Sequence, residues 1–529
     1  MANKNMAKKP AAKKNEKSFE ETLWDAANKL RGSVESSEYK HIVLSLIFLK
    51  FISDTFEKQR QKLIDAGLEK HIDMVPAYTK DNVFYLPEES RWSFIQKNAK
   101  QEDIALKIDT ALSTIEKTNK ALQGALPDNY FSRLGLDVSK LAALIDVINN
   151  IDTLANPHED VVGRVYEYFL SKFAIAEGKG KGEFYTPKSI VNLIAELIEP
   201  YKGTIYDPCC GSGGMFVQSL SFIESHKGNK KDVSVYGQEY TGTTYKLAKM
   251  NLAIRGISAN LGSKDKNTFT DDQHPTLKAD FIMANPPYNQ KNWRESDELV
   301  DDARWDGYET PPTSNANYAW ILHMVSKLSE GGVAGFILSN GVLSSGGTEQ
   351  KIREKLIRNK LVEAIIVLPM NMFYTTDTSV SLWIINKNKK KQVIEHTVDE
   401  TVTLRDRENE TLFIDARNFG SVYDKKFIEF LYERDIQKIV SIFRSWRGEG
   451  FEDNYQNIDE LCYSASISEI ESKGFSLVPS SYIKFKEDQK FSHLDDDLDE
   501  VKDKVVGKIL ADMKVNESLL SIILGDTEQ

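Results

Sequence analysis

Apolar positions follow a helical spacing in the first part of the chain. From Ser18 to about Asn150, apolar residues recur three or four positions apart with charged residues between them, and the segment Ile42–Phe51 is the densest of these. Glycine and proline are sparse in the helical segments, and a loop-rich stretch lies near 71–92. We therefore expect a mostly helical domain over residues 18–150.

The pattern changes at about Asp152, where short β-branched runs begin to alternate with helical segments. This alternation is typical of parallel strands joined by crossover helices, so it predicts an α/β sheet over residues 151–390. The expected strands are Thr204–Tyr206, Val233–Gln238, Phe281–Ala284, Val333–Leu338, Leu361–Leu368 and Val380–Ile385.

Three further segments flank these two domains. Residues 1–17 carry six lysines and one glutamate, which predicts a disordered basic tail or, alternatively, an arm that touches DNA. Residues 391–490 are weakly patterned and are expected to form a mixed C-terminal extension. In residues 491–529, a helix over about 494–524 is predicted by apolar residues at spacings of three and four. These residues are Leu494, Leu498, Val501, Val505, Ile509 and Met513.

Composition excludes several classes of protein. With 41% hydrophobic residues in 529, the chain is neither wholly disordered nor fibrous. It contains no apolar run long enough to span a membrane and no signal peptide, so we expect it in the cytosol. The three cysteines form no CxxC pair and the eight histidines no HExxH motif, so no disulfide framework or metal site is expected.

The net charge restricts how the chain would bind nucleic acid. Lysine and arginine total 68 against 79 aspartates and glutamates, which gives a formal charge of −11. Neutralising phosphates supplies much of the affinity of proteins for DNA. If nucleic acid is the substrate, the positive charge is therefore local, or another subunit provides it.

A glycine-rich loop follows the first expected strand and precedes a helical stretch. Its glycines, Gly211, Gly213 and Gly214, allow a ligand to approach the backbone closely. Asp207 opens the loop and is available to a cationic group, and Glu239, after the next strand, lies about where an acidic residue meets ribose hydroxyls in nucleoside-binding βαβ units. The loop matches neither GxGxxG nor a P-loop, so we expect neither nicotinamide chemistry nor ATP hydrolysis.

The tetrapeptide Asn285-Pro286-Pro287-Tyr288 follows another expected strand. Two prolines stiffen the chain and remove two amide donors, which aims the Asn285 side chain and the Pro286 carbonyl in one direction. Two converging acceptors suit an –NH2 group, whose lone pair they free for attack, and Tyr288 offers a face for a flat base or amide. The alternative is a rigid turn with no chemical role.

With these motifs, the chain resembles the S-adenosylmethionine-dependent amino-group methyltransferases, in the motif order of the gamma group of DNA adenine N6-methyltransferases. The segment Gly182–Lys188 is similar to a cofactor-binding motif in the modification (methyltransferase) subunit of type I restriction-modification systems. Further similar segments are Leu30–Gly32, Phe48–Phe51, Gly163–Phe169, Asn315–His323, Gly331–Gly332 and Thr376–Trp383.

The resemblance implies a Rossmann-like methyltransferase domain that follows a helical N-terminal domain and precedes a C-terminal helical segment. It implies catalysis by Asn285, Pro286, Pro287 and Tyr288, and S-adenosyl-L-methionine as the cofactor. The implied cofactor-binding residues are Glu183, Phe184, Tyr185, Thr186, Pro187, Lys188, Asp207, Gly211, Ser212, Gly213, Gly214 and Glu239.

The resemblance also implies a substrate and partners. The substrate would be N6 of adenine in double-stranded DNA, which a separate specificity subunit would recognise. Two modification subunits would flank that subunit, and a restriction subunit would join them. The C-terminal helix is expected either to pack against the specificity subunit or to dock onto this chain's own core.

Two other functions fit parts of the sequence. A protein glutamine or an RNA base also presents an –NH2 group to an Asn-Pro-Pro-Tyr motif, although the helical N-terminal domain and the segment Glu183–Pro187 favour DNA. A non-catalytic scaffold would retain the fold without the chemistry, but the motif is intact.

Overall fold

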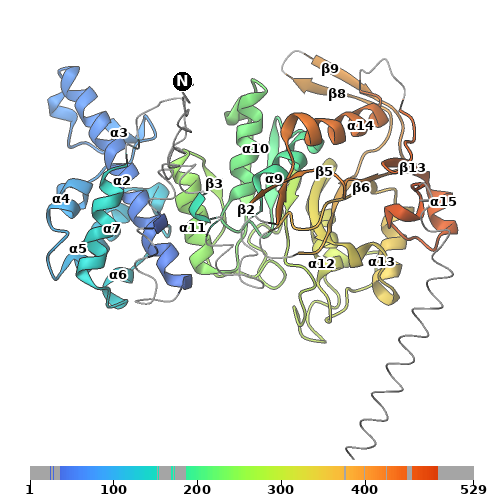
Figure 1. Ribbon diagram of the computed structural model, residues 1–529, viewed down its shortest axis with the longest axis horizontal. Coiled ribbons are helices and arrows are strands. Elements are labelled where there is room, and N and C mark those ends of the chain that lie inside the picture. Colours follow the sequence, from blue (N-terminus) through green and yellow to red (C-terminus); the bar gives the residue numbers. More distant parts are fainter. Residues whose placement is uncertain are drawn as a thin grey trace, which may run out of the picture.

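The computed structural model describes residues 24–25, 28, 36–151, 153, 168–170, 172, 186–373, 377–397, 400–424, 426–449 and 455–485. Within these ranges, a helical N-terminal part lies beside a second part built around one large sheet (Figure 1). The segments 1–17 and 494–524, for which a basic tail and a C-terminal helix are predicted, lie outside the described residues.

The helices are α2 (Ser36–Asp65), α3 (Pro76–Thr79), α4 (Trp92–Lys97), α5 (Ile104–Thr118), α6 (Tyr130–Arg133), α7 (Val138–Asn149), α9 (Lys188–Ile198), α10 (Gly214–Ser225), α11 (Gly242–Ile254), α12 (Asn317–Lys327), α13 (Gly347–Arg358), α14 (Gln437–Arg447) and α15 (Ile467–Ser472). The strands are β1 (Gly203–Asp207), β2 (Val233–Gly237), β3 (Ala259–Asn260), β4 (Ala279–Ala284), β5 (Leu328–Ser339), β6 (Val362–Val367), β7 (Val380–Asn386), β8 (Gln392–Thr397), β9 (Glu400–Leu404), β10 (Glu410–Asp415), β11 (Ser421–Asp424), β12 (Phe427–Glu429) and β13 (Cys462–Ser466). In the described ranges, no helix is both long and apolar enough to cross a membrane.

Helix α2 is the centre of the N-terminal part. Its residues Ile42–Leu49 are each at most 1% exposed, so the middle of this helix is covered on every side. It packs against α4 and α7 of its own part and against α11 of the other. Leu247, Met250 and Ile254 of α11 belong to the same hydrophobic cluster as α2. The N-terminal helices are therefore docked onto the sheet part through α11 (Figure 1).

The nine-stranded sheet has the order β13-β10-β6-β7-β5-β4-β1-β2-β3. The strands from β5 to β3 in this order are parallel, and the chain leaves β1 toward β2 and β3 before it returns to add β4 and β5 on the other side. The strand order thus reverses between β1 and β4. In open α/β sheets, ligands bind at such a point, outside the carboxyl ends of the strands.

Helices cover both faces of this sheet. One face packs against α9, α10 and α14, with α11 beside α10, and the other packs against α12 and α13. Neighbouring residues of a strand point to opposite faces, as Ile205 and Tyr206 of β1 do by joining different clusters. The predicted α/β fold class is confirmed.

All six strands expected from the sequence are present, but the expectation of parallel strands is wrong for β7. This strand is antiparallel to both β5 and β6. The described residues of the connection from β6 to β7 form no helix, and a strand that pairs with its predecessor without a crossover must reverse direction. The structure adds β3, β10 and β13, which the sequence pattern did not predict.

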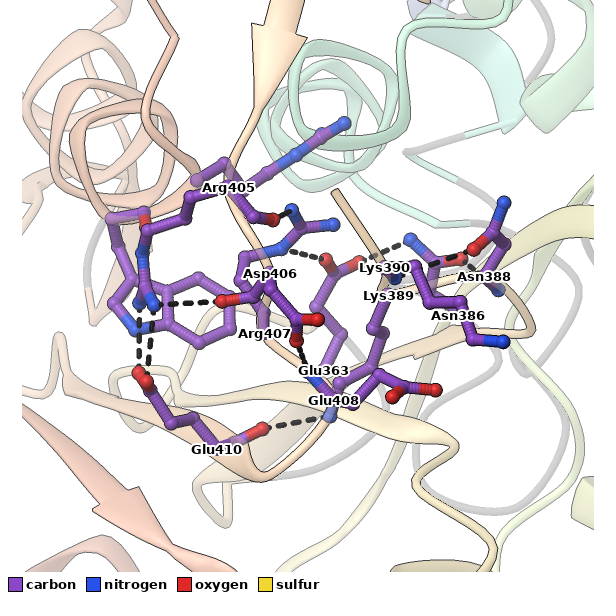
Figure 2. Close-up of polar contacts among 12 residues, drawn as sticks. Glu363, Asn386, Asn388, Lys389, Lys390, Arg405, Asp406, Arg407, Glu408 and Glu410 are labelled. Carbon is purple, nitrogen blue, oxygen red and sulfur yellow. Dashed lines mark hydrogen bonds and ion pairs between the residues drawn. The ribbon is translucent and has the colours of Figure 1, made fainter. Parts of the chain in front are cut away.

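The sheet continues beyond residue 390 through β10 and β13, and a buried polar network joins this addition to the central strands (Figure 2). Glu363 of β6 accepts hydrogen bonds from Arg407 Nε at 3.0 Å and from Asn386 Nδ2 at 2.8 Å. Lys389 Nζ donates to the carbonyls of Val362 at 2.8 Å and Glu410 at 2.7 Å. The network lies at the amino-terminal edge of the sheet.

The charges in this network compensate one another. The side chains of Glu363 and Arg407 are both 0% exposed. Burial by itself would raise the pKa of Glu363, but Arg407 and Arg447 outweigh burial and hold that pKa below its ordinary value. Burial lowers the pKa of Lys389 to about 8, although Glu363 opposes this shift. Each charge is therefore tolerated because its partner is present.

Replacing one partner of the Glu363–Arg407 pair should destabilise the sheet more than replacing both. Arg407→Met leaves the carboxylate of Glu363 buried without its main counter-charge, which we expect to lower the free energy of unfolding by about 3–5 kcal/mol. The double substitution Glu363→Leu with Arg407→Met should recover most of this loss. Chemical denaturation measures both, and equal stability of the single variant and the unaltered protein would contradict the prediction.

Candidate active site

The sequence-predicted site residues gather at one edge of the sheet. Asp207 ends β1, Glu239 follows β2 by two residues, and Asn285 directly follows β4. These three strands are neighbours in the order β4-β1-β2, and they run parallel. Their carboxyl ends therefore lie together at the point where the strand order reverses.

The glycine-rich loop turns tightly between β1 and α10. Gly211 and Gly213 have φ values of +55° and +79°, which residues with a side chain rarely adopt. Asn251 Nδ2 of α11 donates to the carbonyl of Ser212 at 2.8 Å and holds the turn from behind. A Cβ atom at Gly214 would meet no atom within 4 Å. The start of α10 therefore faces open space, where its backbone is accessible to a ligand.

Glu239 joins this loop to the end of β2. Its side chain is 5% exposed, and its Oε2 accepts from the backbone amide of Gly211 at 3.0 Å while its Oε1 accepts from that of Thr241 at 2.7 Å. Each carboxylate oxygen has a second lone pair, so Glu239 is able to accept from a ligand hydroxyl as well. The same carboxylate thus shapes the loop and is available for binding.

Gln238 is a residue of this edge that the sequence analysis did not identify. Its amide N–H donates to the carbonyl of Asp207 at 3.1 Å, and its fully buried side chain donates to the carbonyls of Lys266 and Asp271. It therefore ties the segment after β3 to the ends of β1 and β2. No sequence signal distinguishes it, because its partners are backbone carbonyls.

The two acidic residues have raised pKa values. Burial raises the pKa of Asp207 to about 7, with a contribution from Glu239, although hydrogen bonds from Cys209 act in the opposite direction. Burial also raises the pKa of Glu239, and the amides of Thr241 and Gly211 oppose that shift. Two such carboxyl groups on adjacent strands favour a ligand that brings a positive charge or hydroxyl donors.

The two cysteines of the loop have thiols that stay protonated at neutral pH. Both Cys209 and Cys210 are free, and burial raises the pKa of each thiol well above its ordinary value. Among the residues that the structure describes, no group of three or more metal-binding side chains is found.

Asn285 has a defined side-chain orientation. Its Oδ1 accepts from the hydroxyl of Tyr288 at 2.6 Å, and its Nδ2 donates to Thr186 Oγ1 at 3.2 Å. Both Asn285 and Tyr288 are half-buried, so they remain accessible from the edge of the sheet. The amide oxygen of Asn285, with its second lone pair, is thus presented as a hydrogen-bond acceptor.

Thr186 also connects the segment before β1 to this motif. Pro187 is buried and precedes α9, and Lys188 is the exposed first residue of that helix. Glu183, Phe184 and Tyr185 lie outside the described residues. Of the six predicted cofactor-binding positions 183–188, Thr186 contacts the Asn-Pro-Pro-Tyr motif through its hydrogen bond with Asn285.

Phe373 adds a second aromatic ring that the sequence analysis missed. It lies in the connection after β6, its side chain is 3% exposed, and its ring is edge-on to Tyr288 with 6.4 Å between the ring centroids and 84° between the planes. Since β6 runs in the same direction as β4, both strands end at this edge. The sequence signal for Phe373 is an aromatic residue shortly after a strand. This signal points to the site only when the order and direction of the strands are known.

Comparison with known proteins agrees with this geometry. The model of the N-6 DNA Methylase family matches residues 157–491, and the model of the HsdM N-terminal domain matches residues 19–151. The chain belongs to the N-6 DNA methylase family. This membership confirms the predicted class of enzyme, an adenine-specific DNA methyltransferase.

Relatives of this methylase are similar along most of its length. The HindI methylase subunit of a type I restriction enzyme from Haemophilus influenzae is 40% identical over 420 residues, which cover 75% of this chain and 89% of the relative. The MjaIX methylase subunit from Methanocaldococcus jannaschii is 35% identical over 491 residues, which cover 88% and 84%. The predicted resemblance to type I methyltransferase subunits is confirmed.

A solved structure shows the same fold. The methyltransferase subunit of a type I restriction-modification system from Streptococcus thermophilus superimposes with a TM-score of 0.74 at 23% identity, over 88% of this methylase and 99% of that chain. A modification subunit of a putative type I restriction enzyme from Vibrio vulnificus has a TM-score of 0.58 at 17% identity, over 85% and 92%.

Proposed function

We propose that this methylase transfers a methyl group from S-adenosyl-L-methionine to N6 of adenine in double-stranded DNA, as the modification subunit of a type I restriction-modification system. The observation that carries the proposal is the position of Asn285 and Tyr288. They stand at the end of β4, next to the glycine-rich loop of β1, with the Asn285 amide held in a defined orientation.

The residues on the β1 and β2 side fit the cofactor. The open space at Gly214 admits a ligand against the backbone, and Asp207 and Glu239 supply carboxylates to its cationic and hydroxyl groups. We assign cofactor binding to Asp207, Gly211, Ser212, Gly213, Gly214 and Glu239, together with Glu183, Phe184, Tyr185, Thr186, Pro187 and Lys188. When bound, the cofactor supplies an electrophilic methyl group on a sulfonium centre.

The residues after β4 would act on the amine. The lone pair of N6 is delocalised into the adenine ring, which makes the amine a poor nucleophile. If the Asn285 side chain and the Pro286 carbonyl accept both N6 hydrogens, electron density at the nitrogen rises and its lone pair is released toward the methyl group. The N–C bond would form as the S–C bond of the sulfonium breaks, which leaves a neutral thioether, and the methylated nitrogen would lose one proton to solvent. Pro287 stiffens the turn, and Tyr288, which Phe373 contacts edge-on, would stack on the flat base.

The target base has to leave the double helix to reach this edge of the sheet. Extrusion costs a few kcal/mol of unstacking, which a stacking partner such as Tyr288 partly offsets. Much of the rate acceleration would then come from holding the amine and the methyl donor in line.

The net charge of −11 supports a division of labour among subunits. The relatives are named as subunits of type I restriction enzymes. We infer that a specificity subunit recognises the DNA sequence, that two copies of this chain flank it, and that a restriction subunit joins the assembly. The apolar stripe over 494–524 remains the proposed contact with the specificity subunit.

One assay tests the function against its alternatives. Transfer of labelled methyl groups is measured with duplex DNA, RNA and protein as acceptors, with and without the partner subunits. Methylation of adenine in DNA by the assembled complex is expected. Transfer to RNA or to glutamine, or no transfer by a complex that binds both cofactor and DNA, would contradict the proposal.

Glu239→Ala should weaken S-adenosylmethionine binding. The substitution removes a charged acceptor, worth about 1.5–3 kcal/mol, so we expect affinity to fall about ten- to a hundredfold. Calorimetry on the folded variant measures this loss. Asn251→Ala is a useful comparison, since it loosens the Ser212 turn and leaves the carboxylate in place. An unchanged affinity for Glu239→Ala would remove Glu239 from the site.

Cofactor binding should strengthen with pH through Asp207. With a pKa of about 7, this carboxyl group is mostly protonated at pH 6 and mostly ionised at pH 8. Because a cationic ligand prefers the ionised form, affinity should rise about tenfold over this interval. Asp207→Asn should lack this rise. The unaltered protein and Asp207→Asn share Glu239 and the same cofactor, so pH effects that come from these groups are equal in both. An identical change of affinity with pH in the two proteins would therefore refute the role of Asp207.

Asn285→Ala should abolish methylation while cofactor binding is retained. The lost acceptor acts on the target amine, so we expect kcat to fall at least about a hundredfold with cofactor affinity nearly unchanged. Tyr288→Phe is the matched variant, because it keeps the aromatic ring and removes only the hydroxyl that holds Asn285 Oδ1; its loss should be smaller. Wild-type rates for Asn285→Ala would show that this residue has no chemical role.

A further inference from the structure

Residue 289, directly after the Asn-Pro-Pro-Tyr motif, has an uncommon backbone conformation. Asn289 has a φ of +53°, in the left-handed region that residues other than glycine rarely occupy. Asparagine tolerates this region better than most residues, yet the conformation still has to be stabilised by its surroundings. The orientation of the Tyr288–Asn289 peptide depends on that stabilisation.

Asn317, the first residue of α12, stabilises the conformation of Asn289 through two hydrogen bonds. Its Oδ1 accepts from the backbone amide of Asn289 at 2.9 Å, and its Nδ2 donates to Asn289 Oδ1 at 2.8 Å. Asn317 is 2% exposed, so the polar atoms of its side-chain amide need partners within the protein, and these two bonds supply them. We call this pair of contacts the Asn289–Asn317 clamp.

Neighbouring contacts support the clamp from two directions. Ser339, at the end of β5, donates to Asn289 Oδ1 at 3.2 Å. Asn315 Oδ1 accepts from the amide of Asn317 at 3.0 Å, and the amide of Ala316 donates to the carbonyl of Gln290 at 2.9 Å. The start of α12 is therefore fixed against the chain that leaves the motif.

We propose that Asn317 is a positioning residue for methyl transfer: its side-chain oxygen fixes the Tyr288–Asn289 peptide plane and thereby the direction in which Tyr288 projects. The Tyr288 hydroxyl is the donor that holds Asn285 Oδ1 at 2.6 Å. A rotation of that peptide would move the Tyr288 ring and release the Asn285 amide. Asn317 thus acts on the target amine indirectly, through Asn289, Tyr288 and Asn285.

This inference rests on the proposed function, and four variants of the assembled enzyme separate its parts. Asn317→Ala removes both bonds of the clamp. Asn317→Asp keeps the acceptor for the Asn289 amide at a helix N-terminus, where a negative charge is favoured. Asn289→Gly keeps the amide donor and permits φ of +53° without strain. Asn315→Ala removes the contact to the Asn317 amide and a 3.5 Å contact to Asn289 Oδ1, and it leaves both bonds of the clamp in place.

The expected result is graded. Asn317→Ala should lower kcat about ten- to a hundredfold with unchanged cofactor affinity, measured at a temperature where the variant is fully folded, because small displacements of aligned groups have effects of this size. In Asn317→Asp, Asn289→Gly and Asn315→Ala, kcat should stay within about threefold of that of the unaltered enzyme. Asn317→Asp and Asn315→Ala keep the bond from the amide of residue 289 to the side chain of residue 317, and Asn289→Gly adopts the left-handed conformation without strain.

A spectroscopic readout distinguishes positioning from a general loss of stability. With 2-aminopurine at the target position, Tyr288 should quench the extruded base in the unaltered enzyme and quench it less in Asn317→Ala. If Asn317→Ala does not fold, Asn317→Asp decides: a loss of kcat by a hundredfold despite the retained acceptor overturns the proposal. Full kcat in Asn317→Ala also overturns it. If the unaltered enzyme does not methylate DNA, the proposed function fails instead.

Discussion

The carboxylate of Glu239 makes the interaction on which the arrangement of the loops after β1 and β2 depends. It is almost completely buried, and it accepts from the amides of Gly211 and Thr241, which belong to loops after two different strands. Regular β pairing ends at Asp207 and Gly237, so these loops have no ladder of their own beyond the Gln238 contacts. The buried carboxylate of Glu239 is tolerated because the two backbone amides donate hydrogen bonds to it. The carboxylate in turn orients these two amides.

The two edges of the sheet have different roles. At the amino-terminal edge, Glu363, Arg407 and Lys389 compensate one another and bind β6, β7 and β10 together (Figure 2). At the carboxyl edge, Asp207 and Glu239 have raised pKa values and Asn285 and Tyr288 stay half-buried. The compensated polar network thus joins the strands at one end of the sheet, and the candidate site residues lie at the opposite end.

Contacts from distant segments orient the residues after β4. Thr186 lies 99 positions before Asn285 and is bonded to it, Asn317 lies 28 positions after Asn289, and Phe373 approaches from the connection after β6. Each comes from an element that ends or begins at the same edge. The motif therefore functions as the centre of a small assembly of side chains rather than as an isolated tetrapeptide.

The sequence by itself determined the α/β class, six strands of the sheet and the residues of the motifs, because strand burial and the chemistry of Asp207, Glu239 and Asn285 are local properties of the chain. Only the tertiary structure decided the reversed direction of β7, the addition of β10 and β13, and the contacts of Gln238, Phe373 and Asn317. Strand order and direction depend on pairing between segments far apart, and a side chain that bonds a distant backbone atom has no periodic or compositional signal.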